Sequence, residues 1–314
     1  MEPAQERLAI AHLTTLPCHA LSSHLPGAPT RVAPPAGLSG FVMVAAAAAA
    51  WGTWSLILRP THLPATVSCP IIFLVMGLVA LPGALRGPRT VWDRQTLGLV
   101  ALNAGFDALN AVAFFSAIDH TTVAIAVLSH YLAPILIALA APWIDGVVTR
   151  GARPAAAVAL GGLVIILEPW HAPAGGAVLG ALLGMGSAIC YAGNVFTLRR
   201  LTVRIGATRA MAYHALLAAA VMAPLVAGHL GQFTPRNIGL LAGGAIMLGA
   251  GAGIVFSVGL ARIGSARTAV LTFIEPIVAV AVGALVWDEP LHPIAILGGS
   301  FVLGAGIQVA RKAR

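Results

Sequence analysis

A single acid, Glu275, lies at the middle of the apolar run 266–290 and is followed by Pro276. A carboxylate at membrane depth costs at least about 2.5–3.5 kcal/mol on insertion scales, so we expect it to have a compensating role. A carboxyl group in this setting could carry a coupling proton or bind the ammonium group of a substrate. We assign Glu275 and Pro276 a coupling or gating role. The alternative is a carboxyl group that bonds a neighbouring helix or the backbone freed by the proline.

A histidine occupies the corresponding place in an earlier run. His130 lies near the middle of residues 121–146, and Pro134 follows it. Histidine titrates near physiological pH and can donate or accept a hydrogen bond toward a polar ligand, so substrate contact or coupling is one interpretation. An ordinary hydrogen bond between helices is the other. Pro134 and Pro276 predict two matching broken helices, and His214 is a secondary candidate in a later run.

Three polar residues share one side of a further apolar segment. Asn103, Asp107 and Asn110 are spaced i, i+4 and i+7, which places them on one stripe of a helix. A polar stripe on an apolar helix is what the wall of a water-filled cavity requires. The alternative is a set of hydrogen bonds between helices, each worth about 0.6–2 kcal/mol. The acid favours the cavity.

Aromatic residues complete the candidate set. Trp51 and Trp54 lie on one side of the first apolar segment, and Tyr191 and Asn194 occupy the equivalent places in the sixth. Such rings could stack on a ligand, so we include all four among the substrate-binding or cavity-lining candidates. Ordinary packing or an aromatic belt at the membrane surface would also explain them.

The composition fixes the kind of structure that must position these residues. Hydrophobic residues make up 59% of the 314 and charged residues only 9%, with a mean hydropathy of +0.92. Ordinary globular chains carry about 25% charged residues. Apolar runs of about 20 residues recur, without the alternation of membrane strands. We therefore expect an all-α polytopic membrane protein. The three cysteines are far apart and predict neither a disulfide framework nor a metal site, and we expect no cofactor.

Ten apolar segments can be read along the chain, with short connections that leave no room for a soluble domain. They are about 38–58, 64–84, 96–116, 121–142, 154–169, 175–197, 209–227, 236–258, 266–287 and 292–310. The proline-rich residues 1–37 predict a disordered N-terminal cytoplasmic tail, and 311–314 a basic cytoplasmic C-terminus. Any functional site must therefore lie inside the bundle.

The Lys and Arg residues predict the orientation. With both termini in the cytoplasm, sixteen of the 18 lie on the cytoplasmic side, and only Arg59 and Arg236 lie outside. This asymmetry fits the positive-inside rule for a multi-pass protein of a cell membrane, and a bacterial inner membrane is the expected place. It also explains the net charge of +8 without a nucleic-acid partner.

The two halves of the chain, 38–169 and 170–310, resemble each other. Four pairs of features recur in the same order at nearly one spacing. They are the segments Trp51–Arg59 and Tyr191–Arg199, Pro134 and Pro276, the acidic turns Asp145-Gly146 and Asp288-Glu289, and the pairs Gly161-Gly162 and Gly298-Gly299. Because five helices per repeat is an odd number, the second repeat would be inverted relative to the first. Inverted repeats are typical of secondary transporters.

This arrangement resembles the drug/metabolite transporter superfamily, EamA type, over roughly residues 38–310. The resemblance rests on the 5+5 pattern, the two prolines, the acidic turns and the arginines that end the first and sixth segments. Asp145-Gly146 stands where the family more often has a Gly-Glu pair. The resemblance implies alternating-access transport of small metabolites, often amino acids or aromatic compounds, and often export.

Taken together, the residues predict a secondary transporter for an amino acid or related compound, with Asp107, His130 and Glu275 in one central cavity. No ATP-binding motif is present, so an ion gradient or the substrate's own gradient would drive it, and protons are a candidate coupling ion. We expect no enzymatic activity, and a monomer or homodimer in the bilayer. A lipid-linked sugar flippase of the same fold is the alternative, and an intramembrane enzyme using Gly37-Leu-Ser-Gly40 is a more distant one.

Overall fold

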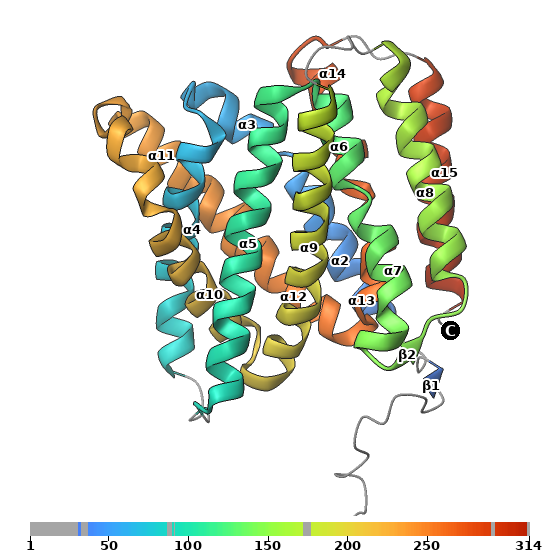
Figure 1. Ribbon diagram of the computed structural model, residues 1–314, viewed down its shortest axis with the longest axis horizontal. Coiled ribbons are helices and arrows are strands. Elements are labelled where there is room, and N and C mark those ends of the chain that lie inside the picture. Colours follow the sequence, from blue (N-terminus) through green and yellow to red (C-terminus); the bar gives the residue numbers. More distant parts are fainter. Residues whose placement is uncertain are drawn as a thin grey trace, which may run out of the picture.

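The computed structural model describes residues 31–32, 37–86, 90, 92–171, 177–289 and 293–312, which form a bundle of helices running roughly side by side (Figure 1). The predicted disordered tail lies outside the described residues except at 31–32 and 37. There the structure differs from the prediction, because Arg31–Val32 forms a short strand, β1, whose backbone pairs in parallel with β2, Val147–Val148.

Helices make up almost all of the described chain. The first half contains α2 (Leu38–Trp51), α3 (Ser55–Leu58), η1 (Arg59–Thr61), α4 (Ala65–Arg86), α5 (Arg94–His120), α6 (Val123–His130), α7 (Ala133–Ile144) and α8 (Ala152–Leu167). The second half contains η2 (Pro169–His171), α9 (Ala177–Ile205), α10 (Ala207–Met222), η3 (Ala223–Gln232), α11 (Pro235–Gly244), the π-helical turn η4 (Ala245–Gly251), α12 (Ala252–Ile263), α13 (Ser265–Leu271), α14 (Ile274–Val286) and α15 (Pro293–Arg311).

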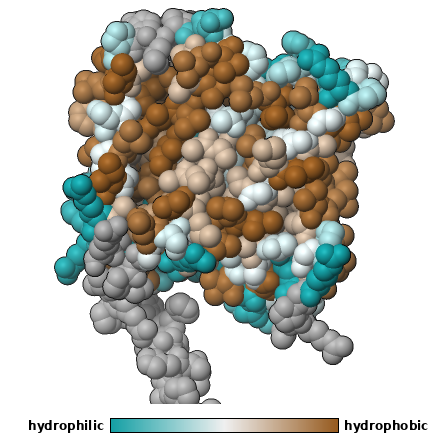
Figure 2. Space-filling view, turned by 180° about the vertical axis from the view of Figure 1, so that it is seen from behind, coloured by the Kyte–Doolittle hydropathy of each residue, from teal (hydrophilic) through white to brown (hydrophobic). Residues whose placement is uncertain are grey.

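Nine helical stretches within the described residues are long and apolar enough to cross a membrane. The surface agrees, because hydrophobic residues cover the middle of the face in Figure 2 and hydrophilic residues gather toward its upper and lower edges. The prediction of an all-α polytopic membrane protein is confirmed. The fifth predicted segment is the exception in length: α8 has 16 residues, about 24 Å of helix against a hydrocarbon core of about 30 Å. The count of ten spans stays a prediction.

Both predicted broken helices are interrupted within one turn before their prolines. The helix α6 ends at His130 and α7 begins at Ala133, and the amide of Leu132 bonds Ser129 O at a long 3.4 Å. In the same way α13 ends at Leu271 and α14 begins at Ile274. A proline offers no N–H to the carbonyl four residues earlier and clashes with it, so the chain turns more tightly at this point.

Close contact between glycines joins α8 to α15. A Cβ atom added at Gly162 would lie 2.5 Å from the carbonyl oxygen of Gly298 and 3.0 Å from Cγ2 of Val302. The neighbouring Gly161 has nothing within 4 Å of an added Cβ. Small residues that let helix backbones approach are the common means of association between helices in a membrane. The packing of these two helices therefore depends on Gly162 rather than on Gly161.

We expect Gly162→Ala to destabilise the protein by about 1–3 kcal/mol, because the added methyl group overpacks the contact with Gly298. Gly161→Ala is the matched control, and it should be neutral or stabilising by up to about 1 kcal/mol because alanine favours helix. Thermal unfolding of the purified protein in detergent measures both. Equal unfolding temperatures for the two variants would contradict the assigned contact.

Candidate functional site

A cavity of about 580 Å³ lies inside the bundle, within the size range of small-molecule sites. At its rim, Arg59 and Glu289 form an ion pair whose side chains are each 49% exposed. We call this the Arg59 end of the bundle; in Figure 1 it is the end at which α3 and α14 are labelled. Nine predicted site residues line the cavity. They are Trp51, Trp54, Asp107, Asn110, His130, Tyr191, Asn194, Glu275 and Pro276.

Two predicted site residues lie elsewhere. Asn103 is fully buried between α5 and α9, where its Nδ2 donates to Asn194 O at 3.2 Å and to Thr197 Oγ1 at 3.1 Å. Pro134 is buried in α7 and is not among the residues that line the cavity. The polar stripe of α5 therefore divides: Asn103 joins two helices, as in the alternative interpretation, while Asp107 and Asn110 face the cavity.

Aromatic rings surround His130. Its ring centroid lies 4.7 Å from that of Phe114 and 5.4 Å from those of Tyr131 and Tyr191. Tyr131 in turn contacts the buried ring of Phe273, 5.5 Å away. The imidazole is thus held between apolar faces, and a ligand in the cavity would meet rings on several sides.

A chain of hydrogen bonds orients the imidazole of His130. Its Nδ1 lies 2.8 Å from Ser187 Oγ, and that hydroxyl donates to Asn110 Oδ1, also at 2.8 Å. Because the single Ser187 proton is used on Asn110, the Nδ1 of His130 must be the donor to Ser187. A neutral His130 in this arrangement keeps the lone pair of Nε2 available to the cavity. The residue can therefore accept a hydrogen bond from a ligand.

The backbone beside Glu275 is irregular and closely packed. A Cβ atom added at Gly52, where α2 ends, would lie 2.5 Å from the carbonyl oxygen of Glu275, so only glycine fits here. The Tyr131 hydroxyl lies within hydrogen-bonding reach of the Glu275 carboxyl group. The neighbouring Trp51 donates from Nε1 to Leu248 O at 2.8 Å, a carbonyl in the π-helical turn η4. Such turns are frequent at functional sites.

Asp107 is paired with a histidine from another helix. Its Oδ2 lies 3.1 Å from His214 Nε2, and His214 Nδ1 lies 2.6 Å from the carbonyl oxygen of Ala210. The His214 side chain is 3% exposed and that of Asp107 is 20% exposed. Both residues line the cavity. The structure thus places the acid of the α5 stripe and the secondary candidate His214 in direct contact.

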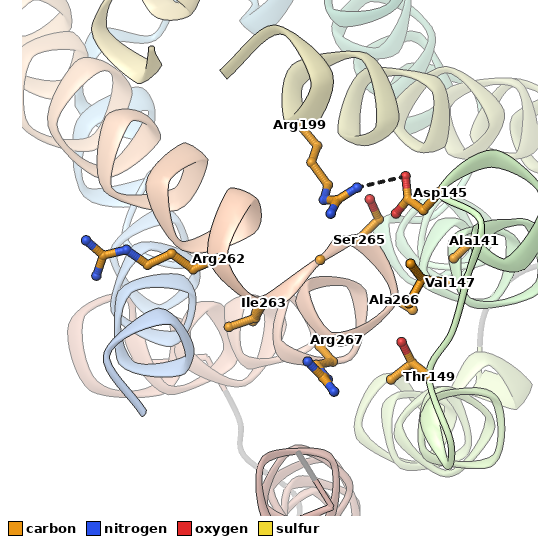
Figure 3. A pocket seen from close by; sticks show the side chains of 11 residues that line it. Ala141, Asp145, Val147, Thr149, Arg199, Arg262, Ile263, Ser265, Ala266 and Arg267 are labelled. Carbon is orange, nitrogen blue, oxygen red and sulfur yellow. Dashed lines mark ion pairs between the residues drawn. The ribbon is translucent and has the colours of Figure 1, made fainter. Parts of the chain in front are cut away.

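A second, smaller pocket of about 60 Å³ lies at the opposite end of the bundle, which we call the Asp145 end (Figure 3). Here Arg199 Nη1 approaches Asp145 Oδ1 at 3.2 Å, and the Asp145 side chain is only 4% exposed. This Oδ1 and the Arg199 Nε have no hydrogen-bond partner, so the pair is held by Coulomb attraction rather than by an aligned hydrogen bond. Ser265 of α13 lines the same pocket, with a buried hydroxyl that also lacks a partner.

Sequence reasoning did not select several lining residues. Phe114 follows Asn110 by one helical turn and could have been found by extending the stripe of α5. Met76 also lines the cavity and gave no signal in the sequence, because it is an ordinary residue of a membrane helix. Ser187 is not part of the lining; it contacts His130 from behind the cavity wall, and no local pattern marked it. Ser39, the serine of the alternative enzyme motif, lies at the start of α2, is absent from the cavity lining and accepts a hydrogen bond from Arg262 Nη1 at 3.2 Å.

Comparison with known proteins identifies the second half of the chain, since residues 178–309 match the EamA-like transporter family. This half resembles an EamA-like transporter domain. A protein of Archaeoglobus fulgidus described as an uncharacterized transporter is 29% identical over 249 residues, covering 78% of this chain and 86% of that protein. These matches confirm the resemblance to EamA-type drug/metabolite transporters and point to transport rather than catalysis.

A solved structure shares the fold. A protein of known crystal structure aligns with a TM-score of 0.71 at 19% sequence identity, over 87% of this chain and 97% of that one. The likeness extends over both halves of this chain, so the arrangement of its helices belongs to a fold that is already known.

The cavity predicts a difference in reactivity between two alanines of α5. Ala111 lines the cavity, whereas Ala104, two turns earlier, is fully buried. In a cysteine-free background, Ala111→Cys should react with a water-soluble maleimide, and Ala104→Cys should react roughly tenfold more slowly or not at all, because a thiol must be accessible to react. Mass spectrometry of timed samples measures both rates. Equal rates would show that the cavity does not reach α5.

Proposed function

We propose that the protein is a secondary transporter that moves a small metabolite across the membrane by alternating access, with the 580 Å³ cavity as its substrate site. The observation that carries this proposal is a cavity with apolar and aromatic walls and a few polar side chains, inside the bundle and reaching a half-exposed ion pair at one end. Along α13 and α14, Phe273 is fully buried between Glu275 of the cavity and Ser265 of the small pocket. We infer that this ring helps to separate the cavity from the Asp145 end.

The helix contacts support two inverted repeats. If two repeats are related by a two-fold axis, a helix near the axis packs on its equivalent in the other repeat. Each remaining contact between two helices occurs a second time between their equivalents. The helices α4 and α10 pack together, as do α8 and α15, and each pair consists of predicted equivalents. The packing of α5 on α9 corresponds to that of α12 on α2. Inverted repeats supply two conformations of similar energy, which alternating access requires.

Two ion pairs follow the same symmetry. Arg59 and Arg199 end equivalent helices, and their partners Glu289 and Asp145 belong to the equivalent acidic turns. Each pair therefore joins one repeat to the other, at opposite ends of the bundle. The Arg59 pair is half-exposed at the rim of the cavity, whereas Asp145 is almost fully buried. We infer that the pair at the closed end seals it and that the pairs exchange roles during transport.

The chemistry of the lining favours a compound with an amino group and an apolar or aromatic part. Asp107 and Glu275 offer two carboxyl groups, and the described lining has one arginine, Arg59, which is paired at the rim. Carboxylates bind ammonium groups through charge-assisted hydrogen bonds. Rings such as Tyr191 and Phe114 suit an apolar side chain, and His130 can accept a further hydrogen bond. An amino acid or related compound has these features.

The distribution of arginines indicates which end of the bundle faces the cytoplasm. Residues at the Asp145 end include Arg199, Arg262 and Arg267, whereas Arg59 lies at the other. Cytoplasmic loops of membrane proteins are enriched in Lys and Arg. We therefore propose that the Asp145 end faces the cytoplasm, so that the cavity opens to the outside in this structure. We also propose that the protein works in export, as the family resemblance implies.

Counterflow in proteoliposomes tests the proposal. A panel of radiolabelled amino acids and related amines should include at least one that exchanges across the membrane. Glu275→Gln and Asp107→Asn should each reduce its flux about tenfold or more, because a hydrogen bond to a charged group is worth about 1.5–3 kcal/mol. Asp119→Asn, at an exposed helix end outside the cavity, is the matched control and should leave the flux unchanged. Normal flux in both cavity variants would refute the assigned site.

The closing role of the buried ion pair gives a separate prediction. Ala141, which is 2% exposed, lines the pocket at the Asp145 end. In a cysteine-free background with Ala141→Cys, adding Asp145→Asn should raise the rate of maleimide labelling from that end severalfold, because it removes the buried charge that holds Arg199, whose own side chain is 26% exposed. Glu289→Gln at the other end breaks an exposed pair worth about 0–1 kcal/mol and should leave this rate within about twofold. If Asp145→Asn leaves the labelling rate unchanged, the Arg199–Asp145 pair does not close this end.

A further inference from the structure

The surroundings of His214 show which of its ring nitrogens carries a hydrogen in the contact with Asp107. His214 Nδ1 lies 2.6 Å from the carbonyl oxygen of Ala210. A carbonyl oxygen only accepts hydrogen bonds, so Nδ1 must carry a hydrogen. In a neutral imidazole this leaves Nε2 as a lone pair, and that atom lies 3.1 Å from Asp107 Oδ2.

A lone pair facing an ionised carboxylate would be two acceptors in contact with no proton between them. Both groups lie inside the bundle, where an unpaired polar group is costly. The geometry is satisfied in two states: an imidazolium beside a carboxylate, or a neutral imidazole beside a carboxylic acid. Each of these holds one proton more than a neutral His214 beside an ionised Asp107. The contact therefore requires a bound proton.

We propose that the Asp107–His214 pair is a proton-binding site and that its loading and unloading couple transport to a proton gradient. The coupling rests on the proposed transport function, whereas the proton site does not. Both residues line the cavity, and Asp107 is 20% exposed. The proton therefore exchanges with water in the cavity: it leaves Nε2 or Oδ2 for water on one side, and the pair is reloaded after the access changes.

The groups that face the pair are acidic or neutral. Cys69 of α4 and Tyr191 of α9 line the same cavity as Asp107. Across the cavity are His130 of α6 and, on α14, Glu275. The part of α12 and η4 that lines the cavity contributes no titratable side chain within the described residues; its members are Gly249, Gly253 and Phe256. Among the described residues, one arginine lines the cavity, and it is paired at the rim. The bound proton therefore supplies the positive charge that balances a cavity acid.

Nuclear magnetic resonance of the purified protein in detergent, with ¹⁵N-labelled histidine, tests the proton site without any substrate. His214→Gln assigns the signal by its loss. At neutral pH, His214 should be either doubly protonated or the Nδ1–H tautomer accompanied by a carboxylic-acid band of Asp107 in the infrared spectrum. In Asp107→Asn, the amide can donate to Nε2, so His214 should become a neutral Nδ1–H imidazole. A neutral Nε2–H tautomer in the unaltered protein would overturn the site.

Proteoliposomes with a trapped pH indicator test the coupling. Transport of a compound found in the counterflow panel should change the internal pH, and His214→Gln should abolish that change while Asp119→Asn preserves it. Transport with no change of internal pH would overturn the coupling. If no compound in the panel is transported, the proposed function fails and the magnetic resonance result still decides whether the pair binds a proton.

Discussion

The structure depends on one constraint: polar groups inside a membrane have no water to bond, so leaving one without a partner within the protein is costly. Where the helices break, the partners converge on the cavity. Trp51 donates to the carbonyl of Leu248 in the π-helical turn, and Gly52 lets α14 approach at Glu275. His130 bonds Ser187. Irregular backbone and polar side chains are thus concentrated where a substrate can use them, and the lipid-facing surface stays apolar (Figure 2).

The features that sequence could predict are local ones. Apolar runs of spanning length predicted the helices, because each helix satisfies its own backbone. The prolines at 134 and 276 predicted the two breaks, because a missing N–H acts within one turn. The limit appears on α5. Asn103 and Asp107 share a stripe, yet Asn103 is covered by α9 and Asp107 reaches the cavity. Periodicity shows on which face of a helix a residue lies. It does not show which neighbouring helix packs against that residue.

The partners of the site residues could not be predicted either, because they lie on helices far away in the sequence. Asp107 and His214 are 107 residues apart, and Arg59 and Glu289 are 230 residues apart. Nothing in a local pattern tells which of several helices an acid will face. The predicted duplication did carry longer-range information, because it aligned Arg59 with Arg199 and the two acidic turns with each other. It did not show that the pairs cross between the repeats, which required the packing of α14 against α2 and α3 and of α7 against α9.

The unequal environments of the two ion pairs bear on how such a protein can alternate. Breaking a buried pair costs about 3–5 kcal/mol, whereas an exposed one contributes about 0–1 kcal/mol. Opening the Asp145 end alone would therefore be unfavourable. If the Arg59 pair is buried as the Asp145 pair is exposed, the two changes largely cancel, since each pair consists of one arginine and one acid. The net difference between the states then falls to a size that a bound substrate or a proton on Asp107 and His214 can reverse, because a ligand shifts an equilibrium only by its difference in affinity for the two states.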